Sequence, residues 1–222
     1  MKPNRKRVNP YTQIAALHNR GIDYVFRQLK DRQSYSEAID FETILEIASE
    51  YMAKIQNDKS DAKKAMNYAE LANLFNMDRD KVVDKMLEEK GIPMDVIGYL
   101  QRVRNLDENL YSDDLIKKIT NIENELLDSD FSNDDIKFVL LYIAIAKGSI
   151  KDWQRNYNLR FPNNFEEKGW PWKEDADTAY QAALIVGPID FFITGSVATV
   201  VSVVGGSVVA STWAAVKNKK NR

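Results

Sequence analysis

The sequence contains no cysteine and a single histidine, His18, among its 222 residues. Without cysteine the chain cannot form disulfide bonds, thiolate nucleophiles or thiolate metal sites. One histidine cannot supply a metal site built from several imidazoles, or a proton relay between two of them. The sequence also lacks a phosphate-binding glycine loop, a Gly-x-Ser-x-Gly motif, a His-Glu-x-x-His motif and an EF-hand loop. We therefore expect no enzyme activity, no cofactor, no metal site and no small-molecule substrate.

Neither sign of charge dominates the chain, which has 31 basic and 33 acidic residues and a net charge of −2. The two signs alternate along the sequence, so no global field attracts nucleic acid. Residues 70–83 superficially resemble a helix-turn-helix, but the second helix would begin with Asp78-Arg79-Asp80 and bring two carboxylates toward phosphates. We expect two bundle helices there, and no nucleic-acid partner.

The N-terminal sequence MKPNRKRVNPY is basic but has no apolar segment of the kind that a Sec signal peptide requires. We therefore expect a cytoplasmic location. Membrane association, or export by a route other than Sec, stays open as an alternative.

Apolar residues recur at helical spacing along most of the chain, and strand-like alternation is rare. The pattern predicts helices over about 10–29, 41–55, 62–75, 81–89, 94–106, 112–126, 133–146, 174–186 and 191–216. Four polar residues stand where N-caps are expected: Asn9, Asp40, Ser112 and Asn133. We predict an all-α bundle of seven to nine helices in a single domain over residues 1–222, with Ile136–Ala146 and the C-terminal stretch as its inner helices.

Residues 148–172 are irregular and rich in aromatic side chains, with Pro162 and Pro171 as helix breakers. We expect a long loop that packs its aromatic side chains onto the bundle. Binding of a sugar or a peptide is the alternative, and exposure of Trp170 and Trp172 would favour it.

The C-terminal stretch, residues 191–216, contains no charged side chain. Small residues recur in it at every fourth position: Thr194, Ala198, Ser202, Gly206, Ala210 and Ala214. On an α-helix this spacing makes a small-residue ridge along which another helix can pack closely. A β-hairpin turning at Gly205-Gly206 is the competing interpretation. The four-residue spacing continues through both glycines, which favours the helix.

The same stretch is long enough to cross a bilayer, because about 20 apolar residues suffice. Its many serine, threonine and glycine residues lower its hydrophobicity, and Asp190 beside it would resist transfer into lipid. We therefore expect a helix buried in the protein core. The alternative is a membrane-inserting protein that releases this helix, as bacteriocins and pore-forming toxins do.

Three ionisable residues are candidates for polar sites. His18 lies on the apolar face of the first predicted helix, where a buried imidazole with one or two hydrogen-bond partners is more common than a general base. Asp175 and Asp177 could bind a divalent cation, but two residues apart on a helix they point to different sides. We expect them in a solvated first turn that complements the helix dipole.

Short motifs stand at the two ends of the chain, at Asn9, Pro10, Tyr11, His18, Asn19, Gly21, Asp175, Ala176 and Asp177. In these residues the chain resembles a group of uncharacterised bacterial proteins, which open with an Asn-Pro-Tyr helix that bears a His-Asn pair and end with a small-residue helix preceded by Asp-Ala-Asp. Its last stretch departs from theirs by having more valine and less glycine. The resemblance implies a helical architecture and supplies no catalytic residue. We expect a non-catalytic binding or assembly role, with a protein partner or self-association.

Overall fold

The computed structural model describes residues 8–31, 39–56, 87–89, 91–107, 112–160, 172–173, 175–177, 180 and 197–220. Side chains are described in these ranges except at 157–159, 197–203, 214 and 217–220. The helices are α1 (Thr12–Asp31), α2 (Phe41–Gln56), α5 (Met94–Arg104), α6 (Ser112–Leu127), α7 (Asn133–Arg160) and α10 (Val197–Lys220). The predicted all-α multi-helix bundle is confirmed. The helix expected over 62–75, most of that over 81–89, the segment 70–83 and Trp170 lie outside the described residues.

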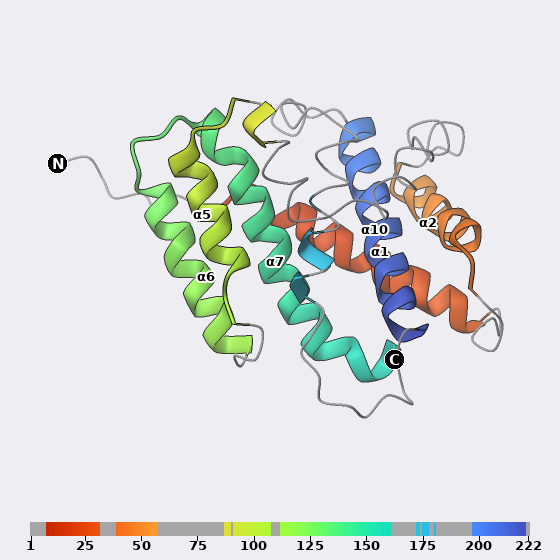
Figure 1. Cartoon of the computed structure of the whole chain (residues 1–222). Coiled ribbons are helices and arrows are strands. Elements are labelled where there is room, and N and C mark those ends of the chain that lie inside the picture. Colours follow the sequence, from red (N-terminus) through yellow and green to blue (C-terminus); the bar gives the residue numbers. More distant parts are fainter. Residues whose placement is uncertain are drawn as a thin grey trace.

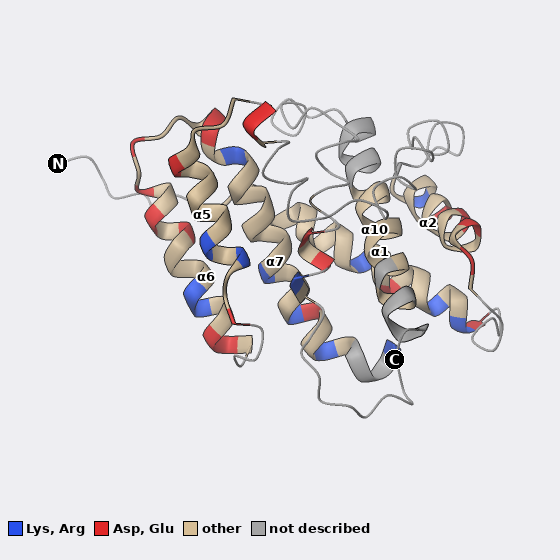
Figure 2. Ribbon diagram, in the orientation of Figure 1, with Lys and Arg blue, Asp and Glu red and all other residues tan. Residues whose placement is uncertain are grey.

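The described helices form two groups of three (Figure 1). Helices α5, α6 and α7 contact one another, and so do α1, α2 and α10. The long helices α1 and α7 cross each other and join the two groups. Charged residues lie mainly on the outer faces, and the described side chains of α10 carry no charge (Figure 2). The polar contacts between the two groups of helices are therefore candidates for a functional site.

Helix α2 begins directly after its predicted cap, Asp40, whereas α1 begins at Thr12, two residues later than predicted from Asn9. The backbone N–H of Tyr11 donates to Asn9 Oδ1 at 3.0 Å, and that of Thr43 donates to Asp40 Oδ1 at 2.7 Å. Each cap satisfies an N–H that has no partner inside its own helix. Helix α1 then buries one apolar stripe: Ile14, Ala15, His18, Gly21, Ile22, Val25, Phe26 and Leu29.

Helix α7 is longer than predicted. All residues of Ile136–Ala146 are buried, as expected of an inner helix, but the helix continues to Arg160. The prediction of a loop was therefore wrong for residues 148–160. Gly148 lies inside the helix, at the point where α1 crosses it. A Cβ at this position would be 2.9 Å from the Ala15 Cβ, so the close crossing leaves no room for a larger residue.

The N-terminal cap of α7 also differs from the predicted one. The backbone N–H of Asp135 donates to Ser132 Oγ at 3.1 Å, and that hydroxyl donates to Asp135 Oδ2 at 2.7 Å. This reciprocal pair makes Ser132 the cap in place of Asn133.

Helix α10 passes between α1 and α2, and its residues from Val204 to Thr212 are all buried (Figure 1). The helix continues through both glycines, so the hairpin alternative is wrong here. Of the small-residue ridge, only Gly206 and Ala210 have described side chains, so the ridge as a whole stays a prediction. Within the described ranges, no helix combines the length and the hydrophobicity that crossing a membrane requires.

A glycine of α1, Gly21, lies against α10 and α2. A Cβ built on Gly21 would lie 2.4 Å from Val208 Cγ2 and 2.8 Å from Tyr51 Cε1. Real Cβ atoms do not approach other atoms so closely, so a larger residue at this position would require the side chains of Val208 and Tyr51 to shift. Gly21 thus lies where α1 packs closely against α2 and α10.

Candidate functional site: a buried polar network

The two aspartates of the Asp-Ala-Asp motif are buried, with Asp175 3% and Asp177 4% exposed. The prediction of a solvated first turn was therefore wrong. Both residues lie in the helical segment 175–177, and they engage different partners, as their spacing predicts. They do not face a common ion.

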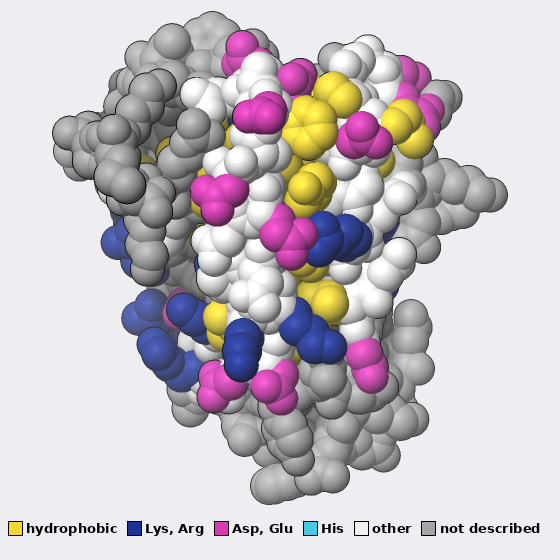
Figure 3. Space-filling model, turned by 90° about the vertical axis from the view of Figure 1, so that its left-hand side faces the viewer, with side chains coloured by type: hydrophobic (Ala, Val, Ile, Leu, Met, Phe, Trp, Pro, Cys, Tyr) yellow, Lys and Arg dark blue, Asp and Glu magenta, His cyan; other side chains and the backbone are white. Residues whose placement is uncertain are grey.

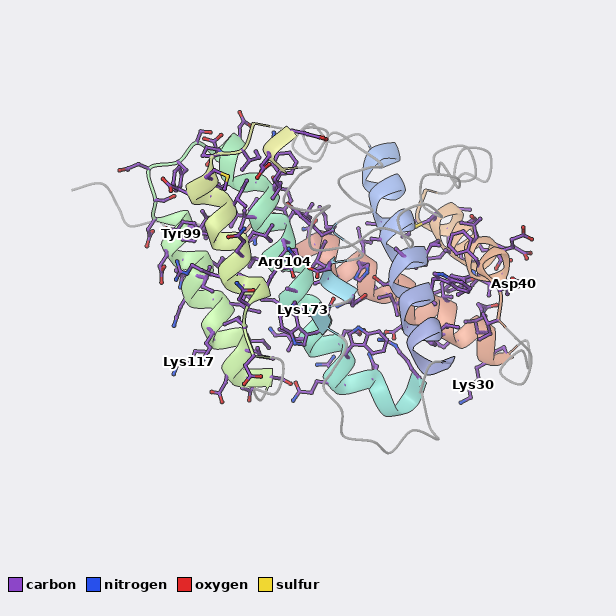
Figure 4. The ribbon with its side chains drawn as sticks, viewed as in Figure 1. Lys30, Asp40, Tyr99, Arg104, Lys117 and Lys173 are labelled. Carbon is purple, nitrogen blue, oxygen red and sulfur yellow. The ribbon has the colours of Figure 1, made fainter. Side chains whose placement is uncertain are left out.

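Asp177 pairs with a buried arginine. Arg104 Nε donates to Asp177 Oδ1 at 3.1 Å, and Arg104 Nη2 donates to Oδ2 at 3.4 Å. The hydroxyl of Tyr142 donates to Oδ1 at 2.8 Å. These contacts tie α5 and α7 to the segment 175–177, and Arg104 lies at this junction in Figure 4. Arg104 is 5% exposed and Tyr142 is fully buried, so these donors take the place of water as partners of the carboxylate.

Asp175 lies between α7 and α1, which belongs to the group α1, α2 and α10. Trp153 Nε1 donates to Asp175 Oδ2 at 2.9 Å, while Asp175 Oδ1 lies 3.7 Å from His18 Nε2 and accepts no hydrogen bond from the described residues. His18 Nε2 also lies 3.0 Å from Ser211 Oγ on α10. A single carboxylate therefore contacts side chains from α1 and α7, next to a serine of α10.

His18 is placed as predicted: it is fully buried and has two polar partners. Its Nδ1 lies 3.0 Å from Asn19 Oδ1, and its Nε2 faces Ser211. The His-Asn pair of the sequence is therefore one hydrogen-bonded unit inside the helix bundle.

Ser211, His18 and Asp175 include the residue types of a hydrolase triad, but their geometry differs from one. In a triad, the serine and the carboxylate contact opposite nitrogens of the imidazole. Here both contact Nε2, and Nδ1 faces an amide. None of the three residues is more than 3% exposed, so a substrate has no access to them. The arrangement suits helix packing rather than acyl transfer.

A second buried polar cluster lies at the start of α1 and was not predicted. Asn9 Nδ2 donates to Glu123 Oε1 and to the carbonyl oxygen of Leu140, each at 2.8 Å, and Lys147 Nζ donates to Glu123 Oε2 at 2.7 Å. One signal in the sequence could have revealed it. Glu123 lies directly after Ile122 within the buried stripe of α6, where a lone carboxylate requires partners.

Arg160 holds the end of α7 against α1. Its Nη2 lies 2.5 Å from Asp23 Oδ1 and 2.5 Å from Asp152 Oδ2. Its guanidinium carbon is 4.4 Å from the centroid of the Trp153 ring. Burial raises the pKa of the Asp152 carboxyl, and the Arg160 charge partly offsets that rise. Sequence reasoning missed this cluster because it assigned the region to a loop.

The outer side of α5 and α6 has an open hollow of about 610 Å³. A Cβ built on Gly98 would meet no atom within 4 Å there, and Arg102 pairs with Glu125 across the hollow at 2.7 Å. Figure 3 shows this side of the molecule, with apolar side chains lying between charged ones. The lining has no histidine, and its one carboxylate is the paired Glu125.

Two tryptophans of the region predicted as an aromatic loop are described, Trp153 and Trp172. Both are buried, in agreement with packing onto the bundle rather than exposure to a ligand.

Within the described ranges, no group of three or more histidine and carboxylate side chains is placed to hold a metal ion.

Comparison with known proteins identifies no relative of this chain. No family model, no curated protein and no solved structure matches it. The resemblance to uncharacterised bacterial proteins is therefore still a prediction.

Tyr142 predicts a dependence of stability on alkaline pH. Burial, and then the neighbouring Asp177 charge, raise the pKa of the Tyr142 phenol well above its ordinary value of 10.0. The folded protein thus holds this proton more tightly than the unfolded chain does. The resulting stabilisation is complete below about pH 10 and is lost as the pH rises toward the folded-state pKa.

We therefore expect Tyr142→Phe to make the fall in unfolding free energy between about pH 9 and pH 11 shallower than in the wild type. Urea unfolding at a series of pH values measures the fall. Tyr51, whose pKa burial also raises, is present in both proteins and cancels in the comparison. Parallel curves for the two proteins would contradict the assignment.

Proposed function

We propose that this chain is a non-catalytic helical protein with a binding or assembly role. One observation carries the proposal: His18, Asp175 and Asp177, the ionisable residues that stand out in the sequence, make buried contacts between helices. A catalytic group must reach its substrate, whereas none of these three residues is more than 4% exposed. The partner in this role is another protein or a second copy of the chain.

In the proposed role, α10 stays packed against α1 and α2. Its described side chains are buried except that of Trp213, which is half-buried, and three of the buried ones are polar: Ser207, Ser211 and Thr212. Polar side chains raise the free energy of transfer into lipid, which opposes the membrane-inserting alternative.

A stability measurement separates a structural from a catalytic role for the network. Catalytic residues are often held at a cost to stability, so replacing them tends to be neutral or stabilising. For residues that hold helices together we expect the reverse: His18→Gln and Asp175→Asn should each lower the midpoint of thermal unfolding. Lys117→Gln, on the exposed surface of α6, is the control and should leave the midpoint unchanged. Unchanged or raised midpoints for both network variants would argue for an active site.

Measurements in solution distinguish the binding role from the membrane-inserting alternative. We expect the protein to be soluble without detergent, and sedimentation velocity over a range of concentrations will show whether it self-associates. We also expect no dye release from liposomes. Release of dye by the soluble protein would favour the membrane-inserting alternative instead.

A further inference from the structure

Helix α5 contains a glycine, Gly98, that packing within the chain does not require. Glycine is less favourable than alanine inside a helix. At Gly21 and Gly148 close packing accounts for it, because a Cβ there would lie 2.4 Å from an atom of α10 and 2.9 Å from an atom of α1, respectively. A Cβ at Gly98 would meet no atom within 4 Å. The close approach that this glycine allows is therefore open to a helix of another molecule.

Gly98 lies beside the open hollow of about 610 Å³ between α5 and α6. Ile122 and Leu106 give the hollow apolar lining, and Met94, which is 63% exposed, stands one turn before Gly98 on α5. Figure 3 faces this side of the molecule, and apolar side chains are visible on it. Burial of this apolar surface favours association with a partner.

The exposed charges of α5 are arranged evenly about Gly98. All residues of this helix are described, and two of them are both charged and exposed: Asp95 and Arg102. They stand three residues before and four residues after the glycine, so all three lie on one face of the helix. Two α5 helices that cross antiparallel at Gly98 would place each Asp95 near the Arg102 of the other copy. The face is therefore complementary in charge to itself.

The charges around the hollow favour an acidic residue of the partner. The charged lining residues are Arg102, Lys118 and Glu125, which are two cations and one carboxylate. Arg102 Nη1 lies 2.7 Å from Glu125 Oε2, and the guanidinium has further N–H donors for a second carboxylate. Asp95 of a second copy would thus meet a surface of net positive charge.

We propose that two copies of this chain associate through the exposed face of α5, with the two helices antiparallel and crossing at Gly98. The proposal rests on the assembly role proposed above and specifies its partner as a second copy. A two-fold axis makes the two Asp95–Arg102 contacts equivalent and closes the assembly at a dimer. A contact centred on one helix from each copy is smaller than the roughly 1,200–2,000 Å² of stable interfaces, so the dimer is weak. It dissociates at the low concentrations suited to unfolding measurements.

Sedimentation velocity tests for the dimer. We expect monomers at micromolar concentration and a reversible dimer, with no larger species, toward millimolar concentration. Asp95→Arg gives the face of α5 two positive charges, and Arg102→Asp gives it two negative ones. Each variant alone should dimerise about tenfold more weakly than the wild type, because like charges meet at both contacts. An equimolar mixture of the two variants should restore association as a heterodimer, because every contact then joins opposite charges.

Two further variants complete the test. Gly98→Gln places a side chain at the crossing point and should abolish dimerisation, while circular dichroism shows that the helical fold is kept. Lys30→Asp, on the exposed end of α1, changes the net charge by as much as Arg102→Asp does and should leave dimerisation unchanged. Figure 4 shows Lys30 on the opposite side of the molecule from Tyr99 of α5.

Three results would overturn the proposal: a wild-type protein that stays monomeric over this range, a variant mixture that does not recover the dimer, and growth beyond a dimer. A two-fold contact cannot add a third copy. The binding role proposed above is tested separately by the unfolding of His18→Gln and Asp175→Asn, which does not depend on self-association.

Discussion

Replacing Arg104 with methionine is expected to lower the free energy of unfolding by about 3–5 kcal/mol, the cost of removing one partner from a buried ion pair. Asp177 would keep its hydrogen bond from Tyr142 but lose the guanidinium, and at 4% exposure it has almost no access to water. Urea unfolding at neutral pH, followed by circular dichroism, measures the loss.

Two variants control for this interpretation. Arg102→Met removes the arginine of the Arg102–Glu125 pair, whose side chains are 48% and 52% exposed, and should leave the unfolding midpoint unchanged. Arg104→Met combined with Asp177→Asn removes both buried charges and should recover a large part of the lost stability. If Arg104→Met is no more harmful than Arg102→Met, the buried pair does not hold these elements together.

Gly21→Ala is expected to destabilise the protein by about 2 kcal/mol or more, because a single methyl group overpacks the junction of three helices. Its Cβ would lie 2.4 Å from Val208 Cγ2 and 2.8 Å from Tyr51 Cε1, and α1 cannot move away without losing its contact with α7. The higher helix propensity of alanine, worth about 1 kcal/mol, offsets only part of this cost. Thermal and urea unfolding measure the difference.

Gly98→Ala is the matched control for this substitution, because Gly98 is also a helical glycine. No atom lies within 4 Å of a Cβ at Gly98, so the propensity gain should appear alone and stabilise the protein by about 1 kcal/mol. Val208→Ala in the Gly21→Ala background removes the clashing methyl group and should restore part of the stability. Equal effects of alanine at Gly21 and Gly98 would show that α10 does not pack closely there.

The sequence by itself determined the all-α class, the cap of α2 and the burial of His18. Helical hydrogen bonds and apolar spacing are local, so the start of α2 could be predicted from Asp40, and that of α1 from Asn9 to within two residues. The position of His18 on an apolar stripe was likewise enough to place it in the core. The absence of charge in residues 191–216 predicted the buried helix that the structure shows over the described part of α10.

Only the tertiary structure decided what the aspartates do. A pair of carboxylates at the start of a helix is usually solvated, and the residues that bury Asp177 are Arg104 and Tyr142, which lie 73 and 35 residues away in the chain. The extent of α7 was also decided by the tertiary structure: residues 148–160 were predicted as a loop, but they continue the helix, and Gly148 lies in it where α1 packs closely. Burial of a charge depends on whether distant elements bring a counter-charge to it, and that information is absent from local spacing.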